Sequence, residues 1–243
     1  MRSLLAAVQF LTRIPVPGLN PSPREIGRSA FWFPVVGLAV GGITLGAYLL
    51  SLRFFPAPIA RLLPLLVQVL VSGAFHLDGL ADTVDALYGG KDREGVLRIM
   101  KDPHLGAMGA ITIALTLLLK AAVLLTLPEG AYRGALLTAP VLGHAAMVGA
   151  LALPYARAEG LGKAFSEHRS ALDLPLAVLL SVLLSFGALE IPGLQSLAAA
   201  AVAGSVPILM ARRRIGGVTG DVCGAANEMA ELGYLLALTG FVR

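Results

Sequence analysis

The sequence is poor in cysteine and in charged residues. Its 243 residues include one cysteine, Cys223, which excludes an internal disulfide and any CxxC metal site. We expect that cysteine to be a small buried residue. Only 14% of the residues are charged, where a soluble domain usually has about 25%. A cleavable signal is not expected either, because the N-terminal apolar run is short, is interrupted by Gln9 and lacks a small-residue cleavage site.

Hydrophobic residues are abundant instead. They make up 56% of the chain, and the mean hydropathy is +0.79. We therefore expect an all-α, polytopic membrane helix bundle in a lipid bilayer, with residues 1–243 forming one integral-membrane domain. The formal charge of +4 is attributed to basic cytoplasmic loops and not to nucleic-acid binding. Stretches of small residues such as SLAAAAVAGS (196–205) let helices approach closely, and they permit a homo-oligomer without requiring one.

About seven segments are apolar enough to cross a bilayer, which takes roughly 20 residues each. They are residues 32–52, 59–76, 104–127, 132–154, 174–190, 194–210 and 222–242. The last carries several polar residues in its first turns. Ahead of the spans, a short N-terminal helix with Arg2 and Arg13 near its ends is expected to lie at the membrane interface.

The distribution of Lys and Arg predicts the orientation. If the N-terminus is inside, fourteen of the nineteen basic residues lie on the inner side and four, including Arg243, on the outer side. Lys120 falls within a span. The loops at 77–103, 155–173 and 211–221 then share the cytoplasmic face, and these loops also carry most of the polar motifs.

Three aspartates stand together in HLDGLADTVDALYGG (76–90). If residues 77–88 are helical, Asp78, Asp82 and Asp85 lie on one face: Asp82 is about 40° from Asp78 about the axis, and Asp85 is about 20° on its other side. Carboxylates at a membrane boundary are costly and usually functional. Together they would repel, and a divalent cation relieves the conflict; hard oxygen ligands favour Mg²⁺ or Mn²⁺. The alternative is a solvated acidic turn.

Candidate substrate contacts surround this cluster. His76 is on the opposite side of the same helix, either touching substrate or serving only as an interfacial histidine. The next segment carries basic residues that suit phosphate groups, although positive-inside topology also explains such charges. These residues are Lys91, Arg93, Arg98 and Lys101. Asp102, before Pro103, either caps the next span or adds a fourth carboxylate.

The C-terminal region carries a second polar group. GGVTGD (216–221) suits a loop whose backbone N–H groups face an anion, which makes Thr219 a candidate substrate contact. Asp221, Asn227 and Glu228 follow in an otherwise apolar helix. Asp221 and Glu228 are candidate catalytic residues and Asn227 a candidate substrate contact; capping or packing between spans is the alternative role.

Three motifs in order closely resemble the cobalamin synthase family: FHLDGLADTVDALYGG, KDREGVLRIMKDPHLGAMGA and GGVTGDVCGAANE. FLTRIPVP (10–17) and FWFPVVGLAVG (31–41) are similar to that family too, so the resemblance is spread over most of the chain. Ala86 stands where the family usually has glycine, and Pro103 where it tends to have serine.

The resemblance implies a Mg²⁺-dependent enzyme of the bacterial inner membrane, with its active loops on the cytoplasmic side. Such an enzyme joins adenosylcobinamide-GDP to α-ribazole or α-ribazole 5′-phosphate and releases GMP. Asp78, Asp82 and Asp85 would then bind Mg²⁺. The general base would be one of these three aspartates, or Asp221, or Glu228.

Two other functions compete with this one. The aspartate pattern is similar to that of CDP-alcohol phosphotransferases, but the second half of their motif is missing, as are the paired motifs of polyprenyl transferases. An ion-coupled transporter is the alternative from another class. The sequence shows no internal repeat, and its charges gather on one side, which favours an enzyme.

Overall fold

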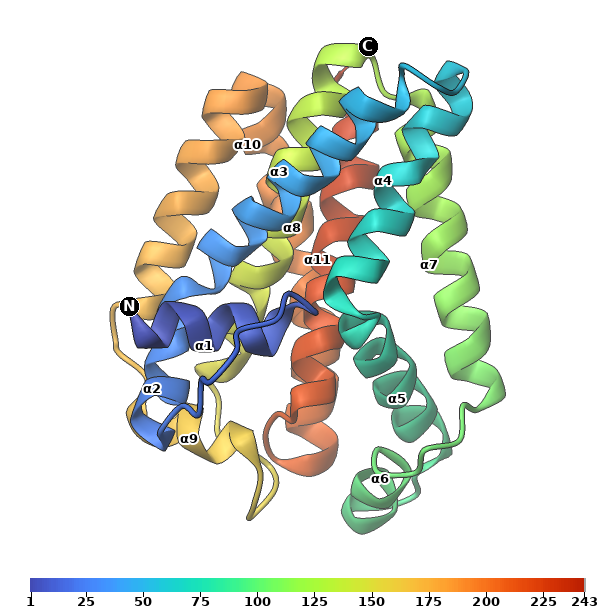
Figure 1. Ribbon diagram of the computed structural model, residues 1–243. Helices are drawn as coiled ribbons and strands as arrows, with labels where there is room; N and C mark the ends of the chain where they lie inside the picture. The colour runs from blue at the N-terminus through green and yellow to red at the C-terminus, as the bar shows by residue number, and fades with distance from the viewer. Residues whose placement is uncertain (243) are drawn as a thin grey trace.

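The computed structural model describes residues 1–242 and is helical almost throughout (Figure 1). The helices are α1 (Arg2–Leu11), α2 (Pro23–Gly27), the 3-10 helix η1 (Arg28–Trp32), α3 (Phe33–Ser51), α4 (Ala57–Ser72), α5 (Phe75–Gly89), α6 (Arg93–Ile99), α7 (Ala107–Thr126), α8 (Glu129–Leu151), α9 (Leu161–His168), α10 (Asp173–Ile215) and α11 (Gly220–Phe241). Within residues 1–242 the only β pairing is one isolated bridge between Tyr155 and Val218. The expected all-α helix bundle is confirmed.

The predicted spans correspond closely to helices. Four helical segments are long and apolar enough to cross a membrane, in α3, α7, α8 and α10, and a fifth if α4 and α5 count as one broken span. The segments 174–190 and 194–210 form the two arms of α10, which bends back at Glu190 (φ 51°, ψ −135°). The segment 222–242 lies in α11, whose polar residues lower its hydropathy. The count of seven spans stays a prediction.

Helix α11 runs through the middle of the bundle, in contact with α5, α7, α8 and α10 (Figure 1). Of its side chains, only a few near the end are exposed. One apolar cluster, containing Phe33 and Ile215, fills the half of the bundle near the start of α11. A second, containing Tyr48 and Tyr132, fills the other half. The start of α11 is therefore held firmly by neighbours from both halves of the chain.

A sharp bend separates α4 from α5. Their axes differ by 82°, and the break falls at Gly73 and Ala74, both with positive φ. Glycine adopts this left-handed conformation without strain, so Gly73 ends α4 naturally. A Cβ atom at Gly73 would also collide with the Arg13 side chain. Because of the bend, α5 does not continue in the direction of α4 and packs instead against α11.

Helix α1 lies across the other helices (Figure 1). It buries Ala6, Ala7 and Leu11, and its Arg2 pairs with Glu25 at 2.6 Å. The predicted helix is confirmed, and its position at a membrane interface stays a prediction.

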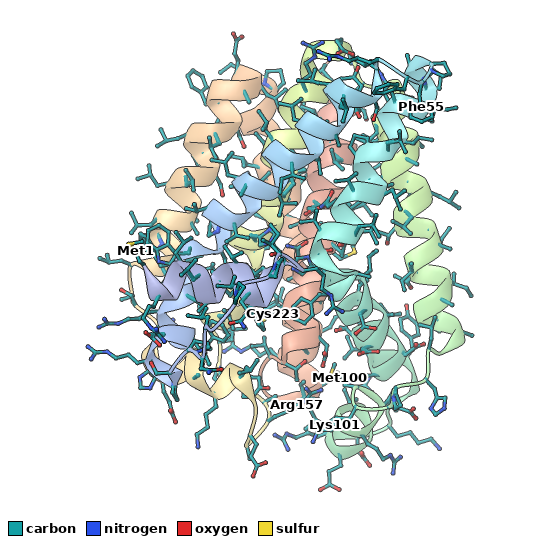
Figure 2. All side chains as sticks on the ribbon, in the orientation of Figure 1. Met1, Phe55, Met100, Lys101, Arg157 and Cys223 are labelled. Atoms are coloured by element: carbon teal, nitrogen blue, oxygen red, sulfur yellow. The ribbon has the colours of Figure 1, made fainter. Side chains whose placement is uncertain are left out.

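The three basic loops expected to share one face do so. We call this face the polar end; it comprises α5, α6, α9 and the turn between α10 and α11 (Figure 1). Arg93 donates hydrogen bonds to the carbonyl oxygens of Ile215 (3.1 Å) and Ala156 (2.8 Å), so it links all three loops. Phe55 lies at the opposite end of the molecule (Figure 2). Arg243, which the sequence places there too, is outside the described residues.

Candidate active site

Helix α5 presents the three aspartates as the sequence predicts. It runs unbroken through Ala86 and ends at Gly89. Asp78 is exposed, and Asp82 and Asp85 are half-buried. The negative charges of Asp78, Asp85 and Asp221 all act on Asp82, which is therefore the centre of the acidic cluster. Among residues 1–242, no side chain donates a hydrogen bond to the carboxylate of Asp78 or Asp82, so neither carboxylate is engaged by a neighbouring side chain.

Asp85, unlike Asp78 and Asp82, is hydrogen-bonded to another helix. Its carboxylate oxygens accept hydrogen bonds from the backbone N–H groups of Gly106 and Gly109, both at 2.8 Å. These groups begin α7, where unpaired N–H groups and the helix dipole attract a negative charge. Gly109 packs on Ala81: a Cβ atom added to Gly109 would lie 3.0 Å from the Ala81 side chain. Asp85 therefore fixes the start of α7 against α5.

A close approach of two helices brings Asp221 to the cluster. A Cβ atom added to Gly79 would lie 2.8 Å from the carbonyl oxygen of Asp221, and one added to Gly224 would lie 3.1 Å from that of His76. Glycines at facing positions let two backbones come this close. The first turn of α11 thus lies directly against α5, and a fourth carboxylate joins the three predicted from the α5 motif.

Arg157 completes the site, and the sequence did not single it out. Its guanidinium donates a 2.8 Å hydrogen bond to Asp221, which also accepts one from the Thr219 hydroxyl at 3.2 Å. The backbone around Arg157 is fixed because Ala156 donates to the carbonyl of Val218 at 2.9 Å. From the sequence, Arg157 was only one of fourteen basic residues assigned to the inner side. No local motif indicates that it pairs with Asp221, which is distant in the sequence.

The four basic candidates occupy three kinds of position. Arg93 is engaged with backbone carbonyls, so its charge stabilises the loops of the polar end. Lys91 and Arg98 are exposed on and near α6. Lys101 lies beside Arg157 at the mouth of a cavity (Figure 2). Of the four, Lys101 is therefore the best placed to meet an anion together with Arg157.

Thr219 stands where the loop motif GGVTGD indicated. It is buried and caps α11, accepting a hydrogen bond from the Val222 N–H at 3.3 Å. Its place beside Asp221 and in the cavity wall is consistent with a substrate contact made partly through the backbone of Gly220. That contact stays a prediction.

Three other candidates lie in the interior, away from the acidic cluster. Glu228 pairs with Lys120 at 2.7 Å, and Lys120 also pairs with Glu231 at 2.7 Å. Asn227 is fully buried against Gly143. His76 is 3% exposed and contacts the ring of His144 edge-on, with centroids 5.1 Å apart. These positions favour the packing alternative for Asn227 and a charge-pairing role for Glu228, and they place His76 in the interior and not at an interface.

Asp102 neither caps α7 nor joins the acidic cluster. Its carboxylate accepts hydrogen bonds from the backbone and ring nitrogens of His104, at 3.0 and 2.6 Å, and these bonds lower the pKa of Asp102. The cap of α7 is supplied by Asp85 instead. Both roles considered for Asp102 from the sequence are therefore wrong: the residue forms a local turn.

A cavity of about 460 Å³ opens beside the Arg157–Asp221 pair. Four aromatic rings line it, those of Phe10, Phe33, Phe75 and Phe165. Its charged lining residues are Lys101, Arg157 and Glu159, and the buried Thr219 lines it as well. Tyr155 lines it as well; burial raises the pKa of the Tyr155 hydroxyl, and the charge of Arg157 opposes the shift. Figure 2 shows Cys223, another lining residue, above Lys101 and Arg157. The cavity is therefore lined by both aromatic rings and charged residues.

The donor set suits a metal that is shared with substrate. Among residues 1–242, no three His, Cys, Asp or Glu side chains converge on a single point that could hold a metal ion. Asp85 is hydrogen-bonded to the start of α7, but Asp78 and Asp82 are one helical turn apart and accept no hydrogen bond from a side chain of residues 1–242. Mg²⁺ is commonly bound by one or two carboxylates together with substrate phosphates and water. Asp78 and Asp82 fit that mode better than an all-protein site.

Together these features define a helical membrane protein whose polar end combines carboxylates, cations and a cavity, as phosphate chemistry requires. The chain belongs to the cobalamin-5-phosphate synthase family, which matches residues 3–239. The resemblance predicted from the three motifs is thereby confirmed.

Curated relatives cover nearly the whole chain. The chain is 45% identical over 237 residues to the adenosylcobinamide-GDP ribazoletransferase of Pseudomonas putida strain KT2440, covering 96% of each protein. It is 43% identical over 240 residues to that of Pseudomonas entomophila, again covering 96% of each. To that of Pseudomonas fluorescens strain Pf0-1 it is 42% identical over 250 residues, covering 99% of the chain and all of the relative. No solved structure matches the chain.

Proposed function

We propose that this protein joins adenosylcobinamide-GDP to α-ribazole, or to α-ribazole 5′-phosphate, and releases GMP. The product is adenosylcobalamin or its 5′-phosphate. The observation that carries this proposal is the meeting of the α5 aspartates with the Arg157–Asp221 pair, at the mouth of a cavity, in a chain of this family. The named activity of relatives that match 96% of the chain supports it.

The reaction is a displacement at phosphorus. A ribazole hydroxyl oxygen forms a bond to the phosphorus on the cobinamide side of the diphosphate. The bond from that phosphorus to the bridging oxygen breaks, and the bridging oxygen leaves on GMP. The hydroxyl proton passes to a protein base. Catalysis of such a transfer consists mainly of positioning and charge stabilisation.

Magnesium is the proposed cofactor, held by Asp78 and Asp82 through the oxygens that no other group engages. When bound, it would neutralise the diphosphate and polarise the reacting phosphorus. Asp85 would act on the site indirectly, by fixing α5 against α7. This assignment narrows the three-carboxylate site expected from the sequence to two direct ligands.

The general base is best sought near the cavity mouth. Asp221 lies there, against α5, and Arg157 holds it in place. Glu228, the other candidate on α11, is buried and paired with Lys120 inside the bundle, so it has no path to a hydroxyl at the mouth. Arg157 and Lys101 would stabilise the negative charge of the phosphates in transit.

We further propose that the protein lies in the bacterial inner membrane with the polar end facing the cytoplasm. The excess of Lys and Arg in the three loops of that end supports this orientation. A soluble phosphorylated substrate would reach the site from that side. The relatives named above are ribazoletransferases, so they do not support the other functions considered for the sequence, a CDP-alcohol phosphotransferase and an ion-coupled transporter.

The test uses purified protein in detergent. GMP is measured after adding adenosylcobinamide-GDP alone, α-ribazole alone or both, each with and without Mg²⁺. The proposal predicts GMP only with both substrates and the metal. Well-folded protein that forms no GMP under these conditions would contradict the proposal. GMP formed without ribazole would indicate a hydrolase instead of a transferase.

A further inference from the structure

The aromatic cavity has the properties of a site for a flat aromatic ligand. Four phenylalanines pack around it with ring centroids close together: Phe10 lies 5.9 Å from Phe33, 5.3 Å from Phe75 and 5.6 Å from Phe165. All four also line the open space. Phe33 and Phe165 also belong to the apolar cluster near the start of α11, and Phe10 and Phe75 pack against it, so the cavity lies at the edge of this cluster.

The cavity also has polar lining residues. Two cations, Lys101 and Arg157, and one carboxylate, Glu159, line it, together with Thr219 and Gly220 at the start of α11. The amino terminus of a helix and two cations form a favourable environment for an anion or for a hydroxyl about to react. A ligand that matches this lining combines a planar apolar ring with a sugar or phosphate.

The size of the cavity selects between the two proposed substrates. A volume of about 460 Å³ is ordinary for a small-molecule site. The corrinoid macrocycle with its side chains is far larger than a compact pocket of this kind. A benzimidazole ring with one ribose is of suitable size and shape. The ring would stack among the phenylalanines, and the sugar would reach the Arg157–Asp221 pair at the mouth.

We propose that this cavity binds the acceptor nucleoside, with its aromatic base lying against the phenylalanines of α1, α3 and α9 and its ribose directed toward Asp221. The identity of the nucleoside as α-ribazole rests on the proposed function; the preference for an aromatic nucleoside rests on the cavity itself. The Arg157–Asp221 pair beside the cavity would bring the hydroxyl to the carboxylate cluster, leaving Asp78 and Asp82 to the diphosphate substrate.

Cys223 offers a direct test because it is small, lines the cavity and is the only cysteine in the chain. Cys223→Phe fills the cavity, whereas Cys223→Ala leaves it open. The matched control is Ala201→Phe, which places the same ring in a separate apolar groove between α8 and α10. Binding of α-ribazole is measured by equilibrium dialysis against detergent-purified protein, without adenosylcobinamide-GDP, so that binding is separate from turnover.

The expected result is that Cys223→Phe raises the Kd for α-ribazole by about tenfold or more, while Cys223→Ala and Ala201→Phe stay within about threefold of wild type. If Cys223→Phe does not fold, Tyr155 decides the matter: Tyr155→Ala should raise the Kd about fivefold or more, and Tyr155→Phe should not.

The outcomes separate this site from the proposed reaction. Wild-type protein that binds α-ribazole, with affinity lost in the cavity variants, supports the site even if no GMP is ever formed. Protein that forms GMP in a ribazole-dependent reaction, but whose Cys223→Phe and Tyr155→Ala variants keep wild-type affinity, overturns the site and leaves the function standing. Wild-type protein that does not bind α-ribazole overturns the site as well.

Discussion

Arg157 donates a 2.8 Å hydrogen bond to Asp221, although the two residues are 64 positions apart in the sequence. The pair joins the loop after α8 to the first turn of α11. Both side chains keep about a fifth of their surface exposed, so the pair is at the mouth of the site and not in the core. A guanidinium in this position can hold the carboxylate and still meet an incoming phosphate.

We expect Arg157→Ala to lower kcat/KM for GMP formation by about 10² to 10³, because a donor aimed at developing negative charge is lost. Arg157→Lys should recover part of the loss, since the charge returns without the planar guanidinium. Arg213→Ala, an exposed residue of the same end, is the control. An Arg157→Ala enzyme with kinetics equal to those of the control would contradict the role.

Asp85 should behave as a structural residue. Asp85→Ala removes the acceptor for the N–H groups of Gly106 and Gly109, and loss of such a helix cap costs about 0.5–2 kcal/mol. The thermal midpoint in detergent should fall, whereas Asp78→Ala, which breaks no hydrogen bond, should leave it unchanged. Equal midpoints for the two variants would mean that Asp85 does not anchor α7.

The buried charges of Lys120, Glu228 and Glu231 should be needed for folding. Lys120→Met leaves two carboxylates unpaired in the interior, and breaking a buried pair in this way costs about 3–5 kcal/mol. Glu228→Gln keeps the Lys120–Glu231 pair and should retain most of the wild-type kcat. A folded Glu228→Gln enzyme without activity would return Glu228 to the list of candidate bases.

The contact between α5 and α11 should tolerate no side chain at Gly79. Gly79→Ala places a Cβ 2.8 Å from the carbonyl oxygen of Asp221, and overpacking of this kind costs about 1–3 kcal/mol. Gly46→Ala in α3 meets nothing within 4 Å and should be neutral or stabilising by about 0.5–1 kcal/mol. Thermal unfolding of both variants tests this: equal midpoints would mean that the helices can separate freely.

The sequence predicted those features of the fold and site that depend on a local pattern of residues. Apolar runs located α3, α7 and α8, and the spacing of Asp78, Asp82 and Asp85 placed them on one face of a helix. Basic residues in three loops indicated that the loops share an end, and the hydrogen bonds of Arg93 connect them, although the sequence had made Arg93 a candidate phosphate contact.

What the sequence could not predict depends on contacts between distant segments. The partner of Asp85 is 21 and 24 residues away, at the start of another helix. Lys120 meets Glu228 across 108 residues. Neither pairing leaves a periodic signal, because a charged residue looks the same in the sequence whether it binds a metal, caps a helix or pairs in the core. Tertiary packing decided between those roles.

The central claim is that the acidic face of α5 is the reaction centre, and Asp82 is the residue at which it is best tested. The most direct measurement is GMP formation by Asp82→Ala in detergent, with Mg²⁺ and both substrates, beside Glu94→Ala as a control on the exposed surface of α6. We predict that Asp82→Ala elutes as folded protein, keeps the wild-type thermal midpoint and forms GMP only at background level, while Glu94→Ala is fully active. An Asp82→Ala enzyme that forms GMP at the wild-type rate would contradict the assignment of this site.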